Sequence, residues 1–220
     1  MRLHLTLSPN TQVVPFNYQH QLTGAVHKWL GDNDLHDKIS LYSFSWLRGQ
    51  AERVKGGLHF PTGAHFMLNF WEADYSSKLI QGIVDDSEVM YGIEVEEVRI
   101  GKTPTFENPQ KFKVASPVLI RKNVDPQKRQ HLTYKDSDVD DYLSRTVITK
   151  LKEIGESKPD ISIKFDRNYP NPKTKLVDIK GSKLRTNLCP VIITGDLKHI
   201  EFAWTVGIGE LTGSGFGALY

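Results

Sequence analysis

Two successive parts of the chain show the same order of strand-like and helix-like hydrophobic patterns, and this repetition limits the fold more than any other feature. Residues 2–7 alternate apolar and polar side chains, as a strand with one buried face does. Residues 17–32 place Leu22, Val26 and Trp29 at helical spacing. Further runs predict strands at residues 40–49, 56–70 and 92–102 and a helix at residues 73–86. The first part therefore predicts the order βαββαβ.

The second part starts after a proline-containing connection and repeats this order. Its predicted elements are a strand at residues 111–122, a helix at 137–155, two strands on either side of Lys180 and Gly181, a helix at 196–206 and a short strand at 217–220. The order βαββαβ defines the ferredoxin-like motif. We therefore predict an α+β protein made of two tandem ferredoxin-like domains, residues 1–110 and residues 111–220, with a glycine-rich loop near the C-terminal end.

Composition indicates a soluble protein. The chain has 220 residues, of which 39% are hydrophobic and 25% charged, which suits one large domain or two small ones. No apolar run approaches the ~20 residues of a membrane span, so we expect an unexported, cytoplasmic protein. The single cysteine, Cys189, has no partner for a disulfide, and neither cysteines nor histidines show metal-binding spacing. We predict no metal and no cofactor.

Positive charge is concentrated in the second part. Residues 1–110 carry 9 Lys and Arg against 13 Asp and Glu, whereas residues 111–220 carry 19 against 13. Within the second part, residues 158–185 hold eight basic and three acidic side chains between turn-forming residues. This segment is a candidate surface for a polyanion, and the alternative is an ordinary solvated face.

Five glycines lie among the last sixteen residues, in the stretch TVGIGELTGSGFGALY. Glycine loses more backbone freedom on folding than any other residue, so such a cluster indicates a sharp bend or a close approach of the backbone. The stretch follows a predicted helix rather than a strand, so it does not match the dinucleotide-binding fingerprint. Two interpretations stay open: a loop whose amides contact an anion, or a hairpin with permissive turns.

The ending VGIGELTGSGFG, with the earlier segments VPFNYQHQLTGAVHKWL and LHDKISLYSFSWL, resembles the CRISPR repeat-RNA processing endoribonucleases of the RAMP superfamily. The resemblance covers nearly the whole chain. It implies a metal-independent nuclease that cuts precursor CRISPR RNA within each repeat and leaves a cyclic phosphate and a 5′-hydroxyl. It also implies a role in antiviral defence, with repeat RNA as the partner.

Metal-free RNA cleavage needs a base for the attacking 2′-OH and an acid for the departing 5′-oxygen. Histidine suits both roles, because its ordinary pKa of ~6.5 leaves both protonation states accessible near neutral pH. His27 on the first helix and His36 in the following loop are the candidate pair. The resemblance implies a lysine before the second strand. Ser40 occupies that position, and Lys38 is the nearest candidate for stabilising transition-state charge.

Several alternatives stay open beside this assignment. His27 can instead belong to a packed helix face, and His36 to the surface; Tyr18 and His20 are less well placed candidates. We expect the glycines and a basic hairpin to bind RNA through Lys173, Lys175, Lys180, Lys183, Arg185, Gly207, Gly209, Gly213, Gly215 and Gly217. Rival functions are a non-catalytic RAMP subunit of a CRISPR effector complex and a ferredoxin-like module for small ligands or proteins. Dimerisation and association with other subunits also stay open.

Overall fold

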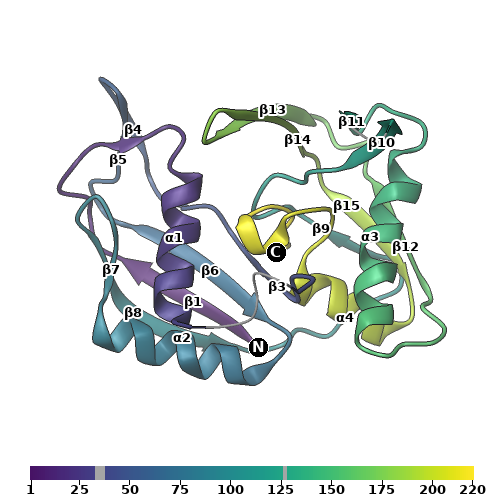
Figure 1. Ribbon diagram of the computed structural model, residues 1–220, viewed down its shortest axis with the longest axis horizontal. Coiled ribbons are helices and arrows are strands. Elements are labelled where there is room, and N and C mark those ends of the chain that lie inside the picture. Colours follow the sequence, from purple (N-terminus) through teal and green to yellow (C-terminus); the bar gives the residue numbers. More distant parts are fainter. Residues whose placement is uncertain (33–37, 126–127) are drawn as a thin grey trace.

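The computed structural model describes residues 1–32, 38–125 and 128–220, and Figure 1 shows two α/β halves side by side. The first half is built on a five-stranded antiparallel sheet in the order β3-β6-β1-β8-β7. Its elements are β1 (Arg2–Leu7), α1 (Gln19–Leu30), β3 (Tyr42–Phe44), β6 (Ala64–Phe70), α2 (Ala73–Asp85), β7 (Glu88–Met90) and β8 (Ile93–Gly101). With two helices in the predicted places, this strand order is ferredoxin-like.

The pleat of β1 separates the two faces of this sheet. Leu3, Leu5 and Leu7 are buried against the hydrophobic side of α1, where Leu22 and Val26 are fully buried. Burial of each such side chain contributes about 1.5–3 kcal/mol. The alternate residues of β1 point to the other face, so the sheet has one face covered by helices and one face open to other contacts.

The second half repeats the same plan. Its central sheet has the order β12-β15-β9, and an isolated bridge between Val114 and Leu219 adds the last part of the chain beside β9. The elements are β9 (Gln110–Phe112), α3 (Val139–Glu153), β12 (Ile161–Phe165), β15 (Val191–Gly195), α4 (Leu197–Val206) and the short 3-10 helix η1 (Thr212–Ser214). The two tandem ferredoxin-like units are thereby confirmed as the fold class. The domain boundary after residue 110 stays a prediction.

Two predicted strands of the second half are corrected by the structure. The run 111–122 does not form one strand: β9 ends at Phe112, and the residues after it bridge to Leu219, Asn187 and Glu210 in turn. The strands around Lys180 and Gly181 exist, but they form a separate two-stranded sheet, β13 (Lys173–Ile179) and β14 (Ser182–Leu188). The central strands β12 and β15 flank this hairpin in the sequence, so it is an insertion into the motif.

Shorter strands complete the architecture. A second inserted hairpin, β10 (Arg121–Asp125) and β11 (Lys128–His131), precedes α3. In the first half, the strand predicted at 40–49 is shorter than expected, because β3 has only three residues. The strand predicted at 56–70 is divided into β5 (Gly57–His59) and β6, with a turn at residues 61–63 between them. A small sheet combines β2 (Val14–Pro15), β4 (Glu52–Val54) and β5 (Gly57–His59). None of the helices in the described ranges has the length and apolarity of a membrane span.

The second half packs on the open face of the first sheet through a buried arginine. The Arg2 side chain donates hydrogen bonds to Asn69 Oδ1, to Trp204 O (3.2 Å) and to Leu219 O (2.8 Å). Its guanidinium carbon lies 3.4 Å from the centre of the Trp204 ring. Burial lowers the pKa of Arg2 to about 9. Residues from both ends of the sequence thus hold the two halves together.

Candidate nucleic-acid interface

Two of the three predicted catalytic residues lie within the described part of the chain. His27 is on α1 and partly buried, and Lys38 is exposed, two residues before Ser40. His36 lies outside the described residues. Ser40 and Tyr42 lead into β3 beside the glycine-rich segment, which we define as residues 207–217: the Tyr42 hydroxyl donates to Gly213 O at 3.1 Å.

The opposite end of α1 contacts the same segment. The Gln19 side-chain amide donates hydrogen bonds to Ser214 O at 3.0 Å and to Gly215 O at 3.2 Å. Trp46 donates through Nε1 to Gly215 O at 2.9 Å. The helix that carries His27 and the glycine-rich segment are therefore direct neighbours, as Figure 1 also shows for α1 and the yellow C-terminal part.

The glycines of this segment have a packing role that the sequence interpretation did not give them. All five are buried, and four have positive φ angles between 65° and 78°. A Cβ at Gly215 would lie 1.8 Å from Gln19 Nε2, and one at Gly217 would lie 1.8 Å from Ile208 O. The glycines are needed because other chain atoms already occupy the space of a side chain.

Four glycine amides of this segment form hydrogen bonds within the protein. The amides of Gly207, Gly209, Gly215 and Gly217 donate to Ala203 O, Thr146 Oγ1, Thr212 O and Pro117 O, respectively. Since these donors are already engaged, the conformation does not present them to an external phosphate. The RNA contacts predicted for Gly207, Gly209, Gly213, Gly215 and Gly217 remain untested by any other observation.

A lysine that the sequence interpretation missed lies beneath the segment. Lys150 on α3 is buried, and its ammonium group donates to Val206 O at 3.0 Å and to Thr212 Oγ1 at 2.7 Å. Burial lowers the pKa of Lys150 to about 7. A cavity of about 390 Å³ beside it also reaches Ser40, so Lys150 lies near the position where the resemblance implies a lysine. Periodicity along α3 could have indicated its inward direction but not its role.

The five basic residues predicted on the hairpin divide between its faces and its turn. Lys180 and Gly181 form the turn, both with positive φ. Lys173 and Lys175 share a face with the buried Val177, and Lys175 Nζ lies 4.2 Å from the Trp46 ring centre. Burial and the nearby Arg53 lower the pKa of Lys175. Lys183 and Arg185 lie on the opposite, outer face and are exposed. Their contacts with a polyanion stay a prediction.

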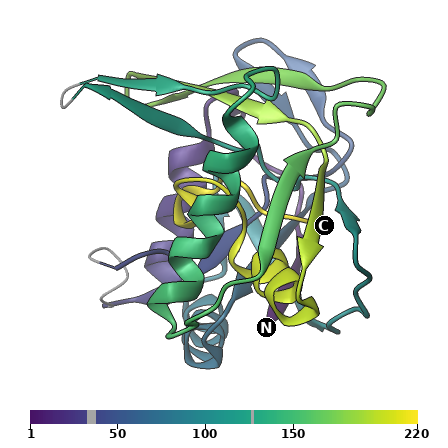
Figure 2. The same cartoon turned by 90° about the vertical axis from the view of Figure 1, so that its right-hand side faces the viewer.

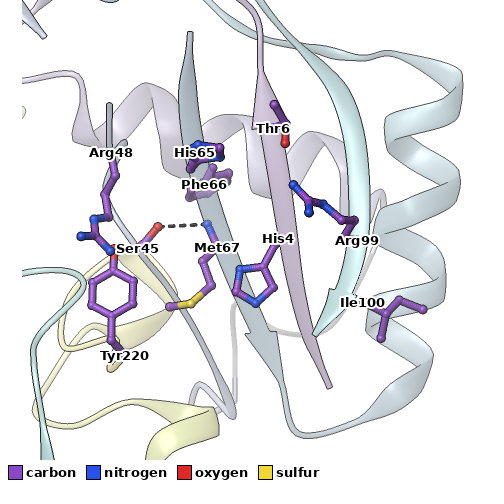
Figure 3. A pocket seen from close by; sticks show the side chains of 10 residues that line it. All are labelled: His4, Thr6, Ser45, Arg48, His65, Phe66, Met67, Arg99, Ile100 and Tyr220. Carbon is purple, nitrogen blue, oxygen red and sulfur yellow. Dashed lines mark hydrogen bonds between the residues drawn. The ribbon is translucent and has the colours of Figure 1, made fainter. Parts of the chain in front are cut away.

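The open face of the first sheet contains a further pocket of about 550 Å³ (Figure 3). Its polar lining comes from several strands: His4 faces Arg99 across β1 and β8, and His65 lies on β6. Burial lowers the pKa of His4, and the nearby cations Arg2 and Arg99 add to that shift. Arg48 lies over the Tyr220 ring, 4.1 Å from its centre. Imidazoles beside guanidinium groups suit hydrogen bonding to bases and phosphates.

Sequence reasoning did not single out His4, Arg48, Arg99 or Tyr220, which line this pocket. The available signal was the alternation along β1, which places His4 opposite the buried leucines. Within the described residues, no group of three or more His, Cys, Asp or Glu side chains is arranged to hold a metal ion.

Comparison with known proteins gives the family. The family described as CRISPR associated protein Cas6, C-terminal, matches residues 101–220, more than half of the chain. No curated protein matches in sequence.

Solved structures support the fold over the full length. A structure described as the characterization of a Cas6-related gene from Pyrococcus furiosus superposes with a TM-score of 0.86 at 21% identity, covering 100% of this chain and 97% of that one. One described as CRISPR associated protein Cas6 gives 0.84 at 22% identity, and one described as an RAMP protein binding different RNA substrates gives 0.84 at 20%; both cover 100% of this chain and 98% of theirs. The family match over the second half and the shared fold together place this chain in the Cas6 family of CRISPR-associated proteins.

Proposed function

We propose that this protein is a metal-independent endoribonuclease that binds CRISPR repeat RNA and cuts precursor CRISPR RNA within each repeat. The observation that carries the proposal is the junction of α1 with the glycine-rich segment and Ser40. There, Gln19 at the start of the helix that bears His27 contacts the glycine-rich segment, and Ser40, two residues after Lys38, lines a cavity beside that segment.

The proposed reaction is an internal transesterification. A base removes the proton of the 2′-OH, whose oxygen forms a bond to phosphorus as the bond from phosphorus to the 5′-oxygen breaks. An acid protonates the departing oxygen, and the products are a 2′,3′-cyclic phosphate and a 5′-OH. His27 and His36 are the proposed base and acid, in either order, and Lys38 is the proposed cation beside the phosphorane.

The test uses repeat RNA from the protein's own genome, excess enzyme and EDTA. We expect cleavage within the repeat, with 5′-OH and cyclic-phosphate ends mapped at the cut. Loss of cleavage in EDTA, or 5′-phosphate ends, would contradict the mechanism. RNA that is bound but never cut would instead favour the non-catalytic subunit of an effector complex.

The catalytic residues are tested separately. His27→Ala and His36→Ala should each slow single-turnover cleavage by about 10²–10⁴-fold while RNA affinity stays close to that of the unmodified protein. His20→Ala is the matched control, because His20 lies on the same helix about two turns away and should leave the rate unchanged. Unchanged rates in both test variants would show that other residues transfer the protons.

A further inference from the structure

A groove that no sequence motif indicated lies between α3 and the β10–β11 hairpin. Two adjoining cavities of about 390 and 300 Å³ form it, and they share Arg121, Arg129, Thr146, Thr149 and Glu210 in their linings. We call it the α3 groove. In Figure 2, the teal hairpin lies across one end of the green helix α3.

The α3 groove carries an excess of positive charge. Its lining contains four cationic side chains and, among the described lining residues, a single carboxylate; the cations are Arg121, Arg129, Arg145 and Lys150. Glu210 accepts two hydrogen bonds from the Arg121 side chain, at 2.6 and 3.0 Å. Its negative charge therefore compensates the charge of Arg121 rather than that of the other cations.

Arg129 and Arg145 are placed for an external anion. Arg129 is 58% exposed, and its nearest approach to Glu210 is 4.0 Å, which is too long for a strong hydrogen bond. Arg145 is exposed one turn along α3 from Thr149, and its guanidinium lies 5.4 Å from the Tyr142 ring centre. Lys150 is buried at the inner end, where it donates to Val206 O and Thr212 Oγ1. The groove thus presents two exposed arginines that Glu210 does not neutralise.

The inner end of the groove adjoins the proposed catalytic segment. Ile39 and Ser40, directly after Lys38, line the same cavity as Lys150 and Thr212. A linear anion lying along α3 would therefore pass from the β10–β11 hairpin to the residues before β3. The cations are spread from the β10–β11 hairpin along α3. A chain of phosphates therefore fits the groove better than a compact ligand does.

We propose that the α3 groove binds the sugar-phosphate backbone of repeat RNA next to the bond that is cut. This inference rests on the proposed function and adds Arg129 and Arg145 as phosphate-binding residues, separate from the β13–β14 hairpin. Contacts of this kind are sequence-tolerant, and each adds a counterion-release contribution to affinity.

The test measures fluorescence anisotropy with a labelled repeat RNA that carries a 2′-deoxyribose at the cut site, so that it binds without being cleaved. The variant is Arg129→Gln/Arg145→Gln in the full chain. The matched control is Lys102→Gln/Lys152→Gln, which also removes two exposed cations but lines neither cavity. Thermal melting of each protein verifies that the exposed substitutions leave the fold intact.

We expect the arginine variant to bind RNA on the order of tenfold more weakly than the control at 100 mM salt. The slope of log affinity against log salt should fall by about 1.4, since each phosphate contact to single-stranded RNA contributes about 0.7. Equal affinity and slope in variant and control, with normal cleavage by the unmodified protein, would overturn the groove assignment alone. That is also the result expected if an acidic protein segment occupies the groove. If the unmodified protein neither binds nor cleaves repeat RNA, both the groove and the proposed function are overturned.

Discussion

Lys150 gives the sharpest prediction for stability, because its ammonium group is buried and forms no salt bridge with a carboxylate of the described residues. Burial lowers the pKa of Lys150 to about 7 in the folded protein, whereas an unfolded chain keeps the ordinary value near 10.4. Between these two pH values the unfolded chain binds one more proton than the folded protein. The free energy of unfolding therefore rises with pH in this window, and below pH 7 the penalty for burying the charge is present in full.

The size of the effect follows from the shift. One pKa unit corresponds to about 1.4 kcal/mol, so the full shift is worth roughly 5 kcal/mol across the window. Between pH 7 and pH 9, titration of Lys150 should raise the free energy of unfolding by roughly 2 kcal/mol. Lys150→Met removes this titration, and it also removes hydrogen bonds to Val206 O and Thr212 Oγ1, which costs about 1–3 kcal/mol at every pH.

The assay is urea denaturation of wild type and Lys150→Met at several pH values from 6 to 9.5. Other titrating groups cancel in the difference between the two curves, so that difference should change by roughly 2 kcal/mol between pH 7 and pH 9 in favour of wild type. Lys152→Met, two residues further on and exposed, should give a difference that is constant with pH. Parallel curves for wild type and Lys150→Met would refute the claim that a buried, desolvated ammonium lies under the glycine-rich segment.

Two further predictions concern the glycine-rich segment and the hairpin. Gly217→Ala should destabilise the protein by more than about 3 kcal/mol in urea denaturation, because φ is +65° and the new Cβ would overlap Ile208 O. Gly24→Ala, in α1 with no atom within 4 Å of the new Cβ, should instead stabilise by about 0.5–1 kcal/mol, and similar effects at both sites would contradict the packing argument. Lys183→Gln/Arg185→Gln on the outer face of the β13–β14 hairpin should lower the salt slope of repeat-RNA binding by about 1.4 relative to Lys102→Gln/Lys152→Gln. An unchanged slope would remove the hairpin from the RNA-binding surface.

Sequence patterns correctly predicted those elements whose structure depends on residues close together in the sequence. The helical spacing of Leu22 and Val26 gave α1, and Asp196 gave the start of α4, where its side chain accepts a hydrogen bond from the Lys198 amide. The Lys180–Gly181 pair gave the β13–β14 turn.

Features that depend on distant partners were not predictable in the same way. The hairpin strands were mistaken for central strands, because pairing of β15 with β9 and β12 joins residues far apart in sequence. Helical spacing from Leu143 and Val147 places Lys150 on the buried face of α3, but lysine is rarely buried, so the residue type argued against that position. The glycine cluster indicated a close approach to the backbone but not the group that approaches it. In the structure, these groups are Gln19 Nε2 and Ile208 O of the protein itself.

The contacts of Arg2 have a consequence for how the molecule matures on the ribosome. Its carbonyl partners, Trp204 and Leu219, follow it by 202 and 217 residues, so the guanidinium keeps its contact with water until both partners have been synthesised and have left the ribosome. Such distant closure is entropically costly and slows folding. Nascent chains stalled before Trp204 should therefore hold a formed first sheet whose open face is still uncovered, a state that chaperones can bind.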